Sequence, residues 1–386
     1  MDSDYLFILQ LAVLLFVAHA AGKISTKLKQ PAVLGQIIAG ILLGFGLIEK
    51  THSLQSFAQI GVIMLMFIAG LETDVDELKR SLKTSSLIAI GGVVAPAILV
   101  FFGVQVLFPS IDQTAALFLG IVTTATSVSI SVQTLKEIGK LKSQQGVMIL
   151  GAAIIDDVVG IVLLTILVGV VRPGLSHSVS QVVVEVVLLF LVITVVGFIT
   201  LRAIKWLKER YDLSEKIDVA ALIICLALAF ISEEFGVAAI TGAYFAGVIF
   251  SMTTYKHKVS HDINKISEMM FTPIFFLSIG MDINLEAAIK ATSIGLLLVI
   301  LGSIGKIIGC GFGARVSGFN HAQSLQIGIG MIPRAEVAII VANYGVQMGI
   351  LSESGMAATI SMVLVSTLIT PMLLKWAFNR ETLVRL

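Results

Sequence analysis

Two adjacent aspartates, Asp156 and Asp157, lie in the middle of an apolar stretch that is long enough to cross a membrane. An ionised carboxylate near the centre of a bilayer costs at least about 2.5–3.5 kcal/mol. Two neighbouring carboxylates also repel each other, so at least one of them should bind a proton or a cation. Successive helix positions point about 100° apart, so one aspartate can face a pathway while the other meets a protein partner. The alternative is a polar pair in a helix–helix interface.

Three further charged residues lie inside apolar stretches. Lys306 is expected to form an ion pair with one of the two aspartates, and a desolvated lysine can release a proton. The alternative is that its side chain reaches along the helix to the membrane surface. Arg334 and Glu336 flank Pro333, and arginine keeps its proton in proteins. We therefore interpret Arg334 and Glu336 as a structural ion pair beside unwound backbone.

A polar run, Thr123–Ser129, interrupts another apolar stretch. Hydroxyl groups and the free carbonyls of a broken helix are oxygen ligands that suit monovalent cations. The alternative is that each hydroxyl bonds the carbonyl four residues earlier in its own helix. The acidic pair one segment away favours the ligand interpretation.

The composition defines the class of protein that must hold these residues. The chain has 386 residues, of which 57% are hydrophobic and 13% are charged, and its mean hydropathy is +1.00. Soluble domains average about 45–50% apolar and about 25% charged residues. A soluble globular protein, a disordered chain and a nucleic-acid binder are therefore excluded, which leaves an all-α polytopic membrane protein. The sequence holds no usable metalloprotease, serine-hydrolase or P-loop motif, so we expect no enzyme.

Thirteen apolar segments are predicted, at 5–22, 33–48, 57–71, 85–108, 114–135, 144–171, 179–201, 217–231, 237–252, 263–280, 288–312, 322–344 and 356–376. Lysines and arginines alternate between the connecting loops, with 21 on one side of the membrane and 3 on the other. Cytoplasmic loops hold the excess of basic residues, which predicts an outside N-terminus and a cytoplasmic C-terminus. The two remaining basic residues are Lys306 and Arg334.

The polar interruptions occupy equivalent places in the fifth and twelfth segments, at Thr123–Ser129 and at Ile332–Glu336. An offset of seven segments means that the two copies enter the membrane from opposite faces. Paired interrupted segments are typical of transporters built from inverted repeats, with the binding site near the midplane.

Taken together, these residues resemble the bacterial monovalent cation:proton antiporters, in the branch that holds the NapA- and GerN-type sodium/proton antiporters and the Kef potassium-efflux proteins. The segments Leu28–Gly35 and Phe67–Glu72 also look like that branch, and the resemblance covers the whole chain. Kef-type relatives carry a large cytoplasmic nucleotide-binding domain, whereas this chain ends ten residues after its last predicted segment. We therefore expect a simple antiporter, with a Kef-type potassium-efflux channel or antiporter lacking its regulatory domain as the alternative.

The resemblance implies a NapA/NhaA-like fold of about thirteen helices, with two broken helices that cross. It implies dimerisation helices in residues 1–83 and 217–287, a mobile core in 84–171 and 288–386, and a linker helix in 172–216. It also implies Asp157 as the main carboxylate for Na+, Asp156 as its neighbour and the partner of Lys306, and Thr126 and Ser127 as further ligands.

The function implied is exchange of Na+, or alternatively Li+ or K+, for H+ across the bacterial cell membrane by elevator-type motion. Electroneutral relatives carry asparagine in the place of Asp156, so its presence with Lys306 implies electrogenic exchange. We expect no cofactor and no nucleic acid, only the transported ions, the lipid bilayer and a second copy in a homodimer as partners.

Overall fold

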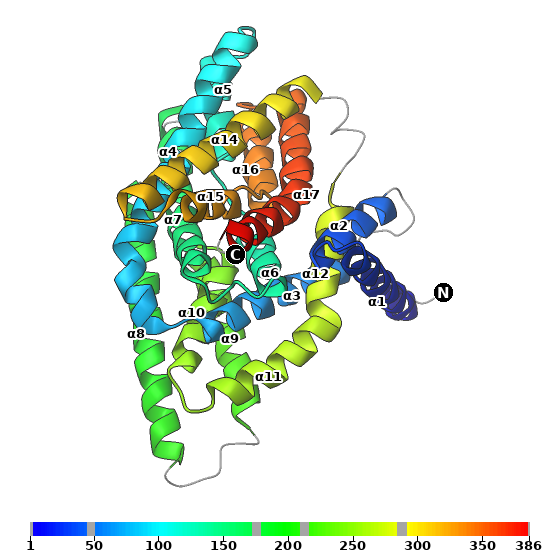
Figure 1. Cartoon of the computed structure of the whole chain (residues 1–386), viewed down its shortest axis with the longest axis vertical. Helices are drawn as coiled ribbons and strands as arrows, with labels where there is room; N and C mark the ends of the chain where they lie inside the picture. Colours follow the sequence, from blue (N-terminus) through cyan, green and yellow to red (C-terminus); the bar gives the residue numbers. More distant parts are fainter. Residues whose placement is uncertain (1–2, 45–50, 172–178, 209–215, 284–291, 385–386) are drawn as a thin grey trace.

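The computed structural model describes residues 3–44, 51–171, 179–208, 216–283 and 292–384. Within these ranges the chain folds into helices without any strand (Figure 1). Seven of the described helices are long and apolar enough to span a membrane. They are α1 (Ser3–Lys27), α3 (His52–Glu72), α4 (Val75–Leu107), α7 (Gln144–Val171), α8 (Val179–Lys208), α14 (Thr292–Val316) and α17 (Glu353–Val384). The prediction of an all-α, multi-pass membrane protein is confirmed.

Two of the predicted segments are each split into a pair of short helices. The fifth segment forms α5 (Gln113–Val122) and α6 (Val128–Glu137), and the twelfth forms α15 (His321–Gly330) and α16 (Glu336–Gln347). Non-helical backbone separates the halves at Thr123–Ser127 and at Met331–Ala335. The predicted interruptions are therefore present, although the first one ends at Ser127, because Val128 and Ser129 already belong to α6.

Side-chain caps begin both split segments. The Asp112 carboxylate accepts a hydrogen bond of 2.9 Å from Thr114 N at the start of α5, and the bonds from Thr114 lower the pKa of this carboxyl group. Asn320 and Gln323 exchange reciprocal bonds at the start of α15. Such caps satisfy backbone donors that the first turn of a helix leaves unpaired.

The remaining described helices include several that are shorter than a full span. They are α2 (Ala32–Leu43), α9 (Ile217–Glu234), α10 (Ala239–Ser251), α11 (Lys256–Ile266), the π-helical turn η1 (Ser267–Phe271) and α12 (Thr272–Met281). The tenth predicted segment, at 263–280, thus begins earlier and contains a π-helical turn. Hydropathy detects only the part of a helix that lipid surrounds, which is also why α4 begins ten residues before its predicted start.

The helices pack in two groups. One group comprises α4, α5, α7 and α14 to α17, and the other comprises α1 to α3, α9, α10 and α12. The first occupies the upper part of Figure 1 and the second the lower and right-hand parts, while α8 runs along one edge and contacts both α7 and α10. The inner half-helix α6 contacts α2 and α3 of the second group as well as α17 of the first. The site residues therefore belong to one group, close to its boundary with the other.

Glycines bring α4 and α14 unusually close together. A Cβ atom added at Gly309 would lie 2.0 Å from the carbonyl oxygen of Gly91, and one added at Gly305 would lie 2.4 Å from Cα of Pro96. Small residues at such contacts let two backbones approach, and membrane helices use them for tight packing. The close approach matters for function because Lys306 lies between these two contacts on α14.

We predict that Gly309→Ala destabilises the protein by about 1–3 kcal/mol, because the new methyl group forces α4 and α14 apart. Thermal unfolding of the detergent-solubilised protein measures this effect. Gly302→Ala on the same helix is the matched control, since its new Cβ would meet Thr123 at an ordinary 3.5 Å. Equal melting temperatures for the two variants would contradict the tight-packing interpretation.

Candidate functional site

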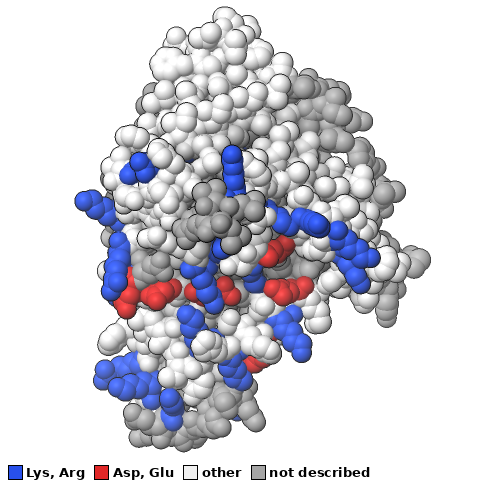
Figure 2. Space-filling model, viewed as in Figure 1, with Lys and Arg blue, Asp and Glu red and all other residues white. Residues whose placement is uncertain are grey.

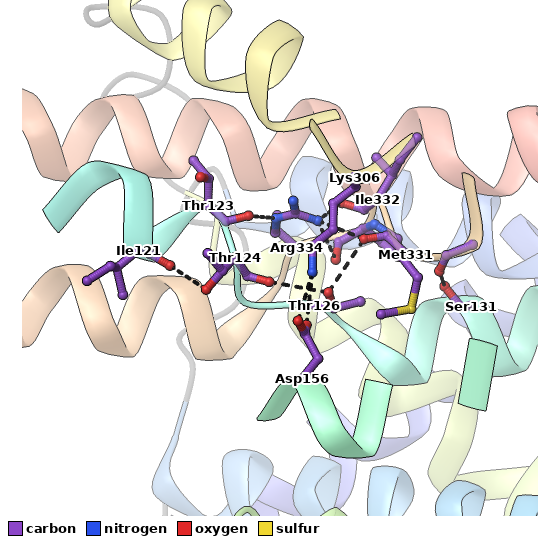
Figure 3. Close-up of polar contacts among 12 residues, drawn as sticks. Ile121, Thr123, Thr124, Thr126, Ser131, Asp156, Lys306, Met331, Ile332 and Arg334 are labelled. Atoms are coloured by element: carbon purple, nitrogen blue, oxygen red, sulfur yellow. Dashed lines mark hydrogen bonds and ion pairs between the residues drawn. The ribbon is translucent and has the colours of Figure 1, made fainter. Parts of the chain in front are cut away.

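The two helix interruptions meet each other directly. Ser127 N donates a hydrogen bond of 2.7 Å to the carbonyl oxygen of Pro333, and Arg334 Nε donates one of 2.8 Å to the carbonyl oxygen of Thr123. Figure 3 shows the two non-helical segments side by side, with Arg334 between them. The broken helices therefore cross at the point where both lose their backbone hydrogen bonds.

Arg334 donates hydrogen bonds to several backbone carbonyls at this crossing. Its side chain is almost fully buried, with 2% of its surface exposed. Besides Thr123, the guanidinium donates to the carbonyl oxygens of Met331, at 3.1 Å, and of Ile332. Buried backbone carbonyls need partners, and a planar arginine can serve several of them at once.

Hydroxyl groups of α17 hold the backbone of Arg334 itself. Arg334 N donates to Ser366 Oγ at 3.2 Å, and Thr367 Oγ1 donates to the Arg334 carbonyl oxygen at 2.5 Å. Both hydroxyl-bearing residues are buried, with 1% and 0% exposed. The interruption is therefore anchored on three sides: by its own arginine, by the other broken helix and by α17.

Lys306 and Asp156 form a buried ion pair. Lys306 Nζ lies 3.0 Å from each carboxylate oxygen of Asp156, and the two side chains are 0% and 1% exposed. Gly92 on α4 packs against the same part of α14: a Cβ atom there would lie 2.4 Å from Cys310 Sγ and at an ordinary 3.5 Å from Lys306 Nζ. Lys306 thus points to an aspartate, as the sequence interpretation expects, and its amine does not extend to the membrane surface.

Asp157 lies beside this pair, at a small cavity of about 80 Å³. The lining is mostly apolar, and its polar side chains are Asp156, Asp157 and Thr124. Ten residues line the cavity: Ile121, Thr124, Ala125, Asp156, Asp157, Gly160, Leu164, Ala238, Val337 and Val341. A volume of this size has room for a monovalent cation.

Thr126 and Ser127, the predicted further ligands, are buried in the interruption and do not line this cavity. Thr126 Oγ1 contacts the carbonyl oxygens of Thr124 and Met331 at 3.4 and 3.5 Å. Ser127 Oγ lies 3.2 Å from Ser129 Oγ. Among the hydroxyl-bearing residues of the interruption, Thr124 lines the cavity, and its Oγ1 donates to the Ile121 carbonyl oxygen at 2.8 Å.

Glu336 is the first residue of α16, and its side chain is not among those that the structure describes. The ion pair of Glu336 with Arg334 therefore remains a prediction. The described hydrogen bonds of the Arg334 side chain go to backbone carbonyls, and these bonds give the buried guanidinium its partners.

Comparison with known proteins identifies the family. Residues 12–380 match the family of the transmembrane sodium/hydrogen exchangers. The chain belongs to the sodium/hydrogen exchanger family. Membership confirms the resemblance seen in the sequence and the prediction of a transporter rather than an enzyme.

Two bacterial relatives of this exchanger match over nearly their full length. The chain is 39% identical over 384 residues to the Na(+)/H(+)-K(+) antiporter GerN of Bacillus cereus, with 98% of each chain covered. It is 32% identical over 385 residues to the Na(+)/H(+) antiporter of Enterococcus hirae, with 96% of this chain and 97% of the relative covered. Both are named as antiporters, and neither name supports the Kef-type alternative.

The exchanger also shares its fold with the sodium proton antiporter MjNhaP1 from Methanocaldococcus jannaschii. The superposition has a TM-score of 0.74, covers 100% of this chain and 98% of the other, and pairs residues that are 17% identical. At that identity the similarity is evidence of a common fold alone.

Several residues that build the exchanger's site carry no clear signal in the sequence. Ser366 and Thr367 look like ordinary polar residues of an apolar helix. Their roles depend on which helices become neighbours. Only Thr124 could have been found, because it belongs to the predicted polar run.

We predict that Arg334→Lys destabilises the protein by several kcal/mol, because a lysine cannot reach the carbonyls of both interruptions. Each buried carbonyl left without a donor costs about 1–3 kcal/mol. Thermal unfolding in detergent measures the loss. Arg315→Lys is the control: its described bond is a single one of 2.7 Å from Nη1 to the Phe319 carbonyl oxygen. If both variants melt alike, the bridging role of Arg334 is wrong.

Proposed function

We propose that this protein exchanges Na+, or alternatively Li+ or K+, for H+ across a bacterial cell membrane. The observation that carries the proposal is the buried Lys306–Asp156 pair beside Asp157 at the wall of a cavity. Family membership and the two antiporter relatives support the same function.

The chemistry follows from competition at a carboxylate. Asp157 binds either a proton or a cation, and Asp156 and the Thr124 hydroxyl offer further oxygen ligands to the cation. Oxygen ligands suit hard monovalent ions. Na+ arriving at the cavity displaces the proton from Asp157, and on the other side of the membrane a proton displaces Na+.

Alternating access requires that the site face each side of the membrane in turn. We propose that residues 84–171 and 288–386 form a core that moves as a unit past a scaffold of residues 1–83 and 217–287, with residues 172–216 as the link. The packing of the helices in two groups supports this division. The scaffold then also provides the contact between two copies in a homodimer.

The distribution of basic residues supports an arrangement of about thirteen spans with the N-terminus outside. Figure 2 shows Lys and Arg together with a row of Asp and Glu across the middle of one face, whereas the upper part of that face is free of them. In the proposed arrangement, the basic residues within 23–29, 79–83, 136–142 and 256–265 lie on the cytoplasmic side. The three basic residues assigned to the other side, Lys50, Arg172 and Lys290, lie outside the described residues.

A channel is the competing class of function. A channel needs a continuous polar lining, whereas the buried charged side chains that the structure describes, Asp156, Lys306 and Arg334, gather near the crossing of the broken helices. Proteoliposomes with a trapped pH dye separate the two classes. Saturable, cation-dependent proton movement supports exchange, and conductance far above carrier rates would refute it.

We predict that Asp157→Asn abolishes cation-coupled proton movement in these proteoliposomes while the protein stays folded. An amide can coordinate a cation weakly, but it cannot trade a proton for one. Asp112→Asn is the control, because Asp112 is an exposed cap of α5 and asparagine caps helices equally well. Exchange at the parent rate in Asp157→Asn would remove this residue from the mechanism.

We further predict that Lys306→Gln turns potential-sensitive exchange into potential-insensitive exchange. In the proposed cycle Lys306 gives up one proton and a carboxylate gives up another for each Na+ bound, so one net charge crosses. A membrane potential then contributes about 2.3 kcal/mol per 100 mV to exchange by the parent protein. Exchange rates in proteoliposomes, with and without an imposed potassium diffusion potential, measure how strongly exchange depends on the potential. Exchange that stays potential-dependent in Lys306→Gln would contradict the carrier role of the lysine.

A further inference from the structure

The last turn of α6 is tied to the first turn of α2, more than 100 residues away in the sequence. The Glu137 carboxylate accepts a hydrogen bond of 2.5 Å from Ala32 N and one of 3.2 Å from Val33 N. A third bond, of 2.9 Å, comes from Gln133 Nε2 in the same helix. The N-cap of α2 is Pro31, which provides no side-chain cap, so a carboxylate from another helix takes that place.

The residue before it binds a different pair of helices. Lys136 Nζ lies 2.9 Å from a Glu268 carboxylate oxygen in η1 and 2.5 Å from Asn264 Oδ1 in α11. Adjacent helix positions point about 100° apart, so one helix end can reach two neighbours in different directions. Lys136 and Glu137 together form what we call the α6 clasp.

All the partners of the clasp outside α6 belong to the second helix group or to α11 and η1, which pack against it, whereas α6 continues from the site itself. The other end of α6 begins at Val128, directly after the interruption. Ser127, the last residue of the interruption, donates its backbone hydrogen bond to the Pro333 carbonyl oxygen. A further contact from the first group lies at the same end of the molecule, where Lys375 Nζ donates to the Lys29 carbonyl oxygen. The described bonds therefore fasten the two groups together at the end where α6 terminates.

Two cavities lie on opposite sides of the interruption. The cavity at Asp157 is lined by α7, by α5 and α16, which are the other halves of the two split segments, and by Ala238 at the start of α10. A second cavity, of about 410 Å³, lies beside the clasp and is lined by residues that include Gln36, Gln133, Glu137 and Thr272. The Oε1 atoms of Gln36 and Gln133 are buried there without a described partner. Asp157 lines the first cavity and not the second.

We propose that the α6 clasp closes the cytoplasmic side of the transport path and must release the scaffold before the site can face the cytoplasm. The inference rests on the proposed function, since it assigns Lys136 and Glu137 as positioning residues for alternating access. Neither residue lines the cavity at Asp157. Their effect is on the equilibrium between the two conformations.

The charges of the clasp suit a reversible fastening. A carboxylate at a helix N-terminus is favourable, but the stabilisation is modest at an exposed site such as Glu137. The Lys136–Glu268 pair is partly exposed, with 14% and 51% of the two side chains accessible, and such pairs are weak. Contacts of this strength hold one conformation without trapping the protein in it.

Two single cysteines report on the two sides of the membrane. Thr272→Cys, on α12 at the second cavity, lies at a position that is 3% exposed. Val341→Cys, on α16, lies at the Asp157 cavity. Both native cysteines, Cys225 and Cys310, are buried and give a low background. Labelling by a membrane-impermeant maleimide is measured for each reporter in proteoliposomes of known orientation, once with the clasp intact and once in the Glu137→Ala background.

We predict that Glu137→Ala makes Thr272→Cys react about tenfold faster from the cytoplasmic side and makes Val341→Cys react more slowly from the outside. A tenfold shift corresponds to about 1.4 kcal/mol between the two conformations. Opposite changes at the two reporters distinguish a shifted equilibrium from general loosening, which speeds both. Unchanged labelling of Thr272→Cys, or faster labelling of both reporters, would overturn the proposal.

Two further variants keep this test decisive. Glu137→Gln retains an oxygen that can accept from Ala32 N, so its labelling should fall between the parent and Glu137→Ala, even if the alanine variant fails to fold. Glu234→Gln is the matched control, because Glu234 also ends a helix but is exposed, and its labelling should equal the parent's. The labelling experiment does not require transport. A parent protein without cation-coupled proton movement would refute the proposed function, whereas the labelling of the two cysteine reporters alone tests the role of the α6 clasp.

Discussion

Lipid offers no hydrogen bonds, so the backbone groups that the two interrupted helices leave free must find partners inside the protein. The structure meets this requirement by placing the interruptions against each other and by filling the crossing with the Arg334 guanidinium. Ser366 and Thr367 then fix the arginine's own backbone. The position of the site follows from this arrangement. Burying a further charge in an apolar bundle costs the least free energy where polar partners are already present, which is at the crossing.

The Lys306–Asp156 pair lies where α4 and α14 pack closely together. A lysine in the middle of a membrane helix is tolerated when a carboxylate lies within hydrogen-bonding distance, and here both oxygens of Asp156 lie at 3.0 Å. Lys306 lies on α14 and Asp156 on α7, and α4 packs against both helices. Glycines at positions 91 and 309 let α4 and α14 approach closely, because a larger residue at either position would hold the two helices apart. Close backbone packing and the buried ion pair are therefore one feature of the structure, built from residues of very different chemistry.

The sequence predicted the parts of this arrangement that are rare in membrane helices. Adjacent aspartates, a buried lysine and a proline next to an arginine stand out against an apolar background, so the helix interruptions and the approach of Lys306 to an aspartate could be expected. The support from Ser366 and Thr367 of α17 could not be singled out, since serine and threonine are common in such helices, whereas Thr124 belongs to the polar run that the sequence marks. Hydropathy also misplaced the start of α4 and of the tenth segment, because helices continue beyond lipid. The Glu137 contact joins residues about 100 positions apart and has no local pattern at all.

The balance of charge at the crossing explains why binding of a cation would be coupled to loss of protons. Arg334 and Lys306 bring two positive charges to the region in which Asp156 and Asp157 can supply two negative ones. Arginine keeps its charge, so the adjustable groups are the lysine and the aspartates. A cation that enters beside Asp157 adds a third positive charge in a region of low dielectric constant, where an uncompensated charge is costly. In the proposed cycle one proton leaves Asp157 and another leaves Lys306, so the charges of Arg334 and Na+ are then balanced by the two aspartates. In the proposed cycle, coupling is thus a consequence of the fixed Arg334 charge, since the residue that satisfies the broken backbone also limits how much positive charge the site can hold.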